Sequence, residues 1–169
     1  MIKSKMILNG YDVEGAKRIL YNTDHKINIV GVDEVFYPYV LMWYSVIVGK
    51  GRLSRLNKFY NCIIDGVMGS TYEGKGIPTM VDVEIEEKKS LAFRVTMEGC
   101  HEIGHNFVMK LFLGKAKLLM VPVIELIKEE VFYKKFYIMH CLDDEDRDYF
   151  IMVDAIDGGL SVLDTPAHF

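Results

Sequence analysis

Long apolar and aromatic runs, separated by short charged or glycine-containing segments, dominate the pattern along the chain. One run covers 35–48 and a second covers 131–142. Each is followed by a shorter apolar stretch, over 60–66 and 149–155 respectively. Stretches rich in valine, isoleucine, tyrosine and phenylalanine, with turn residues between them, are typical of β-hairpins. We therefore expect two hairpins, each formed by a long run and the stretch that follows it.

The two hairpins share a sequence pattern. Val35-Phe36-Tyr37 recurs as Val131-Phe132-Tyr133 at the start of the two runs. Asp65 and Asp154 stand where the returning strands must end, and short acidic side chains favour turns by bonding nearby backbone N–H groups. The pattern predicts a duplicated hairpin unit.

Two helices are expected ahead of the hairpins. Asp12 or Asn9 would cap the first, which ends near Asn22. The second and longer helix is predicted over about 87–113, from an apolar stripe with steps of three and four residues. The segment 118–131 suits a strand or a further helix. We predict an α+β fold, in which the hairpins form an antiparallel sheet and the one long helix packs across a face.

Length and composition narrow the class of protein. The 169 residues fit a single domain, 1–169, with the internal repeat over about 10–78 and 87–166. Half of the residues are apolar, which argues against disorder. A net charge of −4 gives no basic surface for nucleic acid, and the apolar runs are too short to span a membrane. Three cysteines without C-x-x-C spacing favour the cytoplasm over a disulfide framework.

The stretch 101–105, His-Glu-Ile-Gly-His, is the strongest candidate for catalytic chemistry. Residues four apart share a helix face, so His101 and His105 could hold one Zn²⁺ while Glu102 activates its bound water. The stretch resembles the zincin metallopeptidases, which implies a zinc hydrolase with Glu102 as general base. In the gluzincin branch a glutamate about twenty residues later, on a second helix, is the third ligand, and Glu125 lies at that distance.

The chain departs from the zincin pattern outside this core. Val108 and Leu111 stand where metzincins have a glycine and a third histidine. On a helical projection, His101 and His105 fall on the shoulder of the apolar stripe. The alternative interpretation is that they are packing residues with a nearby carboxylate such as Glu98.

Two shorter motifs are incomplete. The segment 69–75 is similar to a phosphate-binding loop, but Gly76 stands where a Ser or Thr would hold Mg²⁺. The aspartates of 144–148 are similar to the opening of a calcium loop, but Tyr149 stands in place of its glycine. We interpret these segments as a connection and a solvated hairpin tip.

The hairpin tips carry opposite charges, which could orient the two copies or attract another molecule. Charged tips also keep edge strands apart. The basic residues are Lys50, Arg52, Arg55 and Lys58, and the acidic ones are Asp143, Asp144, Glu145, Asp146 and Asp148.

The tandem aromatic hairpins resemble an uncharacterised group of bacterial proteins, and this resemblance implies a fold and no particular chemistry. We predict a non-catalytic binding or assembly module without a cofactor, which could form a homodimer through exposed aromatic strand edges. The alternative is a zinc-dependent hydrolase.

Overall fold

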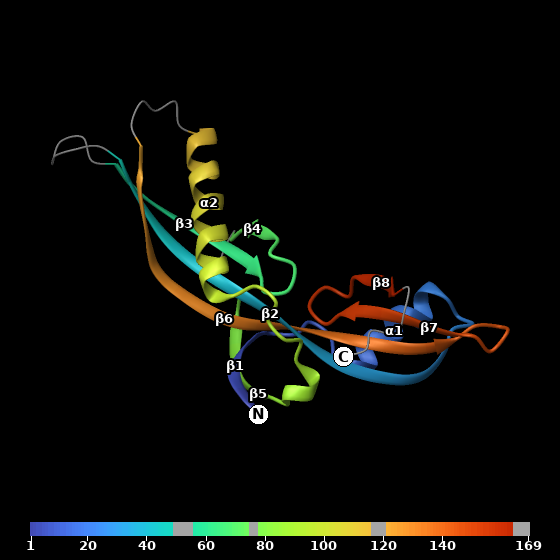
Figure 1. Ribbon diagram of the computed structural model, residues 1–169. Coiled ribbons are helices and arrows are strands. Elements are labelled where there is room, and N and C mark those ends of the chain that lie inside the picture. The colour runs from blue at the N-terminus through green and yellow to red at the C-terminus, as the bar shows by residue number, and fades with distance from the viewer. Residues whose placement is uncertain (49–55, 75–77, 116–120, 164–169) are drawn as a thin grey trace. The chain divides into compact units, whose positions relative to one another are not determined.

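The computed structural model describes residues 1–48, 56–74, 78–115 and 121–163 (Figure 1). Within these residues the chain forms eight strands, two α-helices and one 3-10 helix. The strands are β1 (Ile2–Ile7), β2 (Asn28–Val48), β3 (Leu56–Asp65), β4 (Thr71–Glu73), β5 (Met80–Ile85), β6 (Val123–Leu142), β7 (Asp148–Asp154) and β8 (Leu160–Leu163). The α-helices are α1 (Val13–Thr23) and α2 (Met97–Lys115), and the 3-10 helix is Glu87–Lys89.

Strands dominate the structure, and the α+β prediction is therefore wrong. About 53% of the described residues are in strands and about 22% are helical, and the strands form a mixed sheet. β2 and β6 are 21 and 20 residues long, well beyond the two aromatic runs. The segment that suited either a strand or a helix is a strand from Val123 onward. The apolar pattern underestimated strand length because charged residues occur in the exposed parts of both strands.

The helix predicted over 87–113 begins only at Met97. The residues before it bond to a strand end instead, since the Arg94 N–H donates to the Gly66 carbonyl at 2.9 Å. Thr96 then caps α2, because its hydroxyl accepts from the Gly99 N–H at 3.1 Å. For α1 the prediction is confirmed: Asp12 is the N-cap and the helix runs to Thr23.

The hydrogen-bonded strand order is β4-β3-β2-β6-β1-β5, with β7 on β6 and β8 on β7. β3 pairs antiparallel with β2, with Asp65 opposite Tyr39. β7 pairs antiparallel with β6, with Asp154 opposite Phe136. β1 and β5 form a further antiparallel pair. No helix among the described residues is long and apolar enough to cross a membrane.

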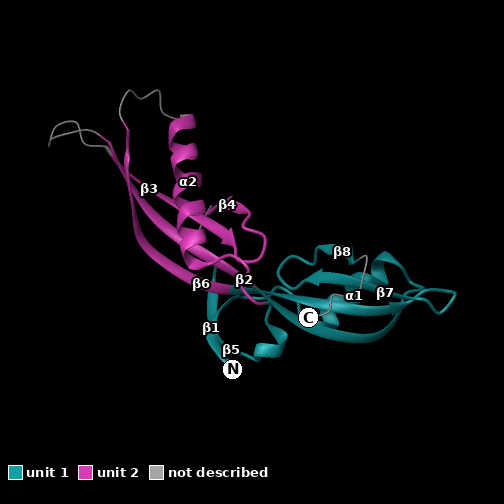
Figure 2. Ribbon diagram, in the orientation of Figure 1, with its two compact units in different colours: residues 1–37, 78–91, 133–169 teal, residues 38–77, 92–132 magenta. Residues whose placement is uncertain are grey.

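The chain divides into two compact units (Figure 2). The α1 unit comprises 1–37, 78–91 and 133–169, and the α2 unit comprises 38–77 and 92–132. α1 packs on β6 and β7, whereas α2 packs on β2 and β3. Along the sequence, however, α1 precedes β2 and β3, and α2 precedes β6 and β7. Each helix therefore packs on the hairpin of the other repeat.

The two units have the same turn after the hairpin. In the α2 unit the Gly69 N–H donates to the Asp65 carbonyl, and in the α1 unit the Gly158 N–H donates to that of Asp154, both at 2.9 Å. The φ angles of the two glycines are +72° and +76°, in the left-handed region that favours glycine.

The entry to each helix is also the same. The Gly10 and Tyr11 N–H groups both donate to the Ala155 carbonyl, as those of Arg94 and Val95 both donate to that of Gly66. Along the hairpins, the Ala155 N–H donates to the Lys135 carbonyl and the Gly66 N–H to the Pro38 carbonyl. These bonds and the strand registers align Tyr11 with Val95, Asp12 with Thr96, Lys135 with Pro38, Phe136 with Tyr39 and Tyr137 with Val40. On the strands this alignment differs by one residue from that of the Val-Phe-Tyr triplets.

The cores of the two units distribute side-chain volume differently. Gly104 lies centrally on α2, and an added Cβ would meet the Tyr44 hydroxyl of β2. By the alignment above, Leu20 and Cys141 occupy the corresponding places in the α1 unit, and both are buried. A small helix residue faces a large strand residue in one unit, and the sizes are reversed in the other. Such exchange conserves core volume, which close packing requires.

Candidate functional site: a polar groove beside α1

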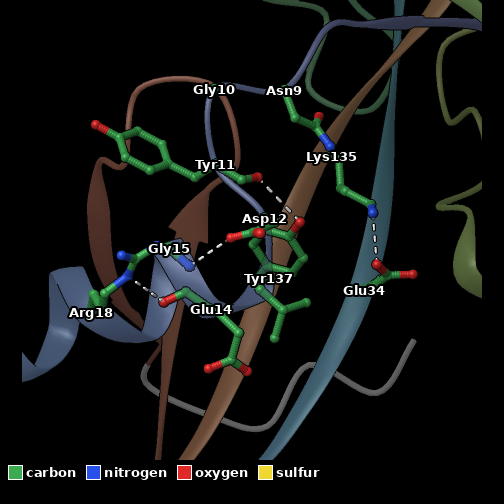
Figure 3. A pocket seen from close by; sticks show the side chains of 11 residues that line it. Asn9, Gly10, Tyr11, Asp12, Glu14, Gly15, Arg18, Glu34, Lys135 and Tyr137 are labelled. Atoms are coloured by element: carbon green, nitrogen blue, oxygen red, sulfur yellow. Dashed lines mark hydrogen bonds and ion pairs between the residues drawn. The ribbon is translucent and has the colours of Figure 1, made fainter.

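A groove of about 820 Å³ lies beside the N-terminal turn of α1, within the α1 unit (Figure 3). The residues 9–15 and Arg18 come from the helix and the loop before it. Glu34 on β2, with Lys135 and Tyr137 on β6, completes the lining. The loop is fixed to the turn after β7, because the Gly10 N–H bonds to the Ala155 carbonyl.

The sheet side of the groove carries a partly buried ion pair. The Lys135 Nζ is 2.6 Å from Glu34 Oε1, and the Lys89 Nζ is 3.2 Å from Glu34 Oε2. Burial alone would raise the pKa of the Glu34 carboxyl, but the hydrogen bonds and charges of the two lysines outweigh it and hold the pKa below its usual value. Glu34 is therefore a fixed negative charge at neutral pH.

Tyr137 lies between the two sides (Figure 3). The residue is only 2% exposed, and its hydroxyl donates to the Tyr11 carbonyl at 3.3 Å. Burial raises the pKa of Tyr137, and nearby Lys135 offsets part of this effect. The hydroxyl thus stays protonated at neutral pH and serves as a hydrogen-bond donor.

The helix side also carries both signs of charge. Asp12 caps α1 by accepting from the Gly15 N–H at 2.7 Å. Glu14 pairs with Lys17 at 2.8 Å. The Arg18 Nε donates to the Glu14 carbonyl at 3.4 Å, and the side chain is exposed. Figure 3 shows Arg18 and Glu14 on the opposite side of the groove from Lys135 and Glu34.

Asn9 contributes a side-chain amide to the groove, and its oxygen has no role in holding the described part of the fold together. Its Oδ1 is buried and has no hydrogen-bond partner among the described residues. Leaving a buried acceptor unpaired costs about 1–3 kcal/mol. The neighbouring loop residues are held by backbone bonds, so the Asn9 side chain adds polarity to the groove without securing the loop.

The α2 unit shows which lining residues the shared skeleton requires. At the places of Lys135 and Tyr137 it has Pro38 and Val40, and at that of Tyr11 it has Val95. In both units the helix cap and the turn glycine are retained. Apolar residues at these three places accompany the same backbone geometry, so this geometry does not require the side chains of Tyr11, Lys135 and Tyr137.

The sequence-predicted zinc residues lie in the α2 unit, on α2 and β6. The His101 Nε2 is 2.5 Å from the Glu129 Oε2, and both side chains are partly exposed. Glu102 and His105 are exposed on α2, and Glu125 is exposed on a strand, not on a second helix. Among the described residues no three His, Cys, Asp or Glu side chains come close enough to hold a metal. The zinc site, with Glu102 as general base, stays a prediction from the sequence.

The acidic tip between β6 and β7 is a closed turn. Asp143 Oδ1 accepts from the N–H groups of Glu145 and Arg147 at 2.8 and 2.9 Å. Arg147 Nε donates to the other Asp143 oxygen at 2.8 Å. In the first tip, Lys50, Arg52 and Arg55 lie outside the described residues, as does the end of the glycine-rich segment 69–75.

The three cysteines are buried and unpaired. Burial raises the pKa of the Cys62 thiol to about 12, so the reactive thiolate is scarce at neutral pH. Burial likewise raises the pKa of the Cys100 and Cys141 thiols. These residues fill cores, and none of them lines the groove.

Comparison of the chain with protein-family models, with curated proteins and with solved structures gives no match. The groove was not predicted from the sequence, because its residues are distributed over 9–18, 34 and 135–137. One signal was present: under the structural alignment, Lys135 and Tyr137 replace Pro38 and Val40 of the other repeat. Aligning the repeats on the Val-Phe-Tyr triplets shifts the strands by one residue, so that Lys135 and Tyr137 are no longer compared with Pro38 and Val40.

Proposed function

We propose that the protein is a non-catalytic binding module, and that the groove beside α1 holds a small polar ligand. The observation that carries this proposal is a difference between the units: Tyr11, Lys135 and Tyr137 line the groove beside α1, and apolar residues take their places beside α2. Small-molecule sites typically have volumes of about 300–1,000 Å³ and a few placed polar groups. The groove, at about 820 Å³, falls within this range.

The electrostatics of the groove support recognition over proton transfer. A general acid or base works best with a pKa near the operating pH. The pKa of Glu34 is shifted down, and hydrogen bonding and charge from Glu34 raise that of Lys89. Both shifts move away from neutrality, so these groups keep their charges and can orient a ligand. The three buried thiols also support a cytoplasmic location.

Ligand-observed NMR with a library of small polar fragments tests the proposal. We expect fragments to bind the full-length protein, and binding to weaken in Lys135→Met and Tyr137→Phe. Lys128→Met is the matched control, since Lys128 lies on the same strand in the α2 unit, over the Trp43 ring. If no fragment binds, or the control weakens binding as much as Lys135→Met, the proposal fails.

Metal analysis separates the binding module from the hydrolase alternative. Protein purified without added zinc should contain no stoichiometric metal. Stoichiometric zinc that is lost in His101→Ala would replace the binding module with a zinc enzyme centred on α2.

A further inference from the structure

We infer that the ligand of the groove is a small dipolar molecule carrying one carboxylate and one amine, as a free amino acid or a short peptide does. This inference rests on the proposed function and specifies its ligand. The charges, the available hydrogen-bonding groups and the comparison between the units support it separately.

Charges of both signs line each side of the groove. A purely anionic ligand would lie among the carboxylates of Asp12, Glu14 and Glu34. A purely cationic ligand would lie beside Arg18 and Lys135. Two like charges about 4 Å apart repel by roughly 4 kcal/mol near a protein surface. A ligand with both charges avoids this cost by orienting each end toward its complement.

Arg18 is suited to the carboxylate end. Its Nε makes one long bond, 3.4 Å to the Glu14 carbonyl, and the side chain is exposed. A guanidinium has five N–H donors in a planar arrangement that matches a carboxylate with two parallel hydrogen bonds. Lys17 pairs with Glu14, which partly neutralises the Glu14 carboxylate.

Asp12 and Glu34 are suited to the amine end. Asp12 uses Oδ1 to cap the helix, and a carboxylate has about four acceptor positions. Glu34 is held in its charged form by Lys135 and Lys89. In Figure 3 the Asp12 carboxylate lies between the Arg18 side and the Glu34 side, and its charge contributes to the raised pKa of Tyr137. An ammonium group there would donate to carboxylate oxygens while the ligand carboxylate reaches Arg18.

The α2 unit lacks both halves of this arrangement. Thr96 replaces Asp12 as the cap, and counting along the helices from these caps aligns Glu102 with Arg18. The cap function needs only a side-chain oxygen, which Thr96 supplies. The carboxylate of Asp12 and the guanidinium of Arg18 are thus additions to the shared skeleton, and they are complementary in sign to the ends of a dipolar ligand.

Calorimetric titration of the full-length protein at neutral pH and low salt tests the ligand class with three matched probes. Glycylglycine carries both charges, N-acetylglycylglycine lacks the amine, and glycylglycine amide lacks the carboxylate. We expect glycylglycine to bind about tenfold more tightly than either capped form, the loss expected from one hydrogen bond to a charged group.

Two variants assign the ends. Arg18→Gln should abolish the preference over the amide, and Asp12→Asn, which keeps a good helix cap, should abolish the preference over the acetylated form. Glu102→Gln, at the matching position of α2, should change neither.

The outcomes distinguish the proposed ligand class from the proposed binding function. If a capped form binds as tightly as glycylglycine, or if only unrelated polar fragments bind the groove, the dipolar class is wrong and the binding function stands. If neither the fragments nor any of the three probes binds, the proposed function itself fails.

Discussion

The α1 and α2 units have the same turn, a side-chain cap at the same helix position and the same strand pairing, yet two polar strand residues beside α1 have apolar counterparts beside α2. Asp154 and Gly158 repeat the bonds of Asp65 and Gly69. Lys135 and Tyr137, in contrast, align with Pro38 and Val40. Turns and caps therefore define this skeleton, while the residues beside the helix entry differ between the units.

The sharpest test of the shared skeleton exchanges core volume on α2. Gly104→Leu should destabilise the protein by about 3 kcal/mol, because the added side chain overlaps the Tyr44 hydroxyl. Adding Tyr44→Cys, which reproduces the Leu20–Cys141 pair of the α1 unit, should restore part of that loss. Urea unfolding of both variants measures the effect. A double variant no more stable than the single one would show that the two cores are not equivalent.

Alanine at the two turn glycines tests whether the turns are equivalent. Gly69→Ala and Gly158→Ala should each cost about 1–2 kcal/mol, because both glycines have a left-handed φ. The cost should be greater at Gly158, where an added Cβ would lie 2.6 Å from Ile19 Cδ1, than at Gly69, where the nearest atom is at 3.5 Å. Thermal unfolding gives the order, and the reverse order would refute the packing account of the α1 unit.

The ion pairs of Glu34 with Lys89 and Lys135 lie within the α1 unit and predict a pH dependence of stability. Glu34→Gln should lower the free energy of unfolding by about 1–2 kcal/mol at neutral pH. The native pKa of Glu34 lies below the unfolded value near 4.5, so its charge stabilises the fold above that pH. The stabilisation is lost as the pH falls through the native pKa, and the variant and the original chain should converge there. A difference independent of pH would exclude the lysine pairing as its source.

The smallest effect concerns the helix caps. Asp12→Ala and Thr96→Ala should each cost about 1 kcal/mol, because each removes the acceptor for a first-turn N–H. Asp12→Asn and Thr96→Ser should recover most of the loss in urea unfolding. A cap that tolerates alanine without cost would indicate that its helix is positioned by packing alone.

The sequence predicted those elements that depend on residues close together in the chain. Asp12 was predicted as a cap because short polar side chains favour helix starts, and the apolar residues of α1 that are four apart, Ala16 and Leu20, are buried. The aromatic runs lie within β2 and β6. Local pattern could reveal these because capping and apolar periodicity are properties of neighbouring residues.

The remainder depends on distant residues and could not be read from local pattern. β1 and β5 are short and contain charged residues, and they are strands because they pair with each other and, for β1, with β6. Each helix packs on the hairpin of the other repeat. Helical periodicity shows which face of a helix is buried, but it does not show which hairpin that face contacts. Predicting the groove would have required the strand register, because a shift of one residue changes which side chains of the two repeats correspond.

An NMR titration that follows both units at once tests whether a polar ligand binds beside α1 and not beside α2. The ¹⁵N-labelled protein is titrated with the tightest-binding polar fragment, and backbone amide shifts are followed. We expect changes at Gly10, Tyr11 and Gly15, and none at the matching amides of Arg94, Val95 and Gly99. Equal changes in the two sets, or changes confined to α2, would contradict this expectation.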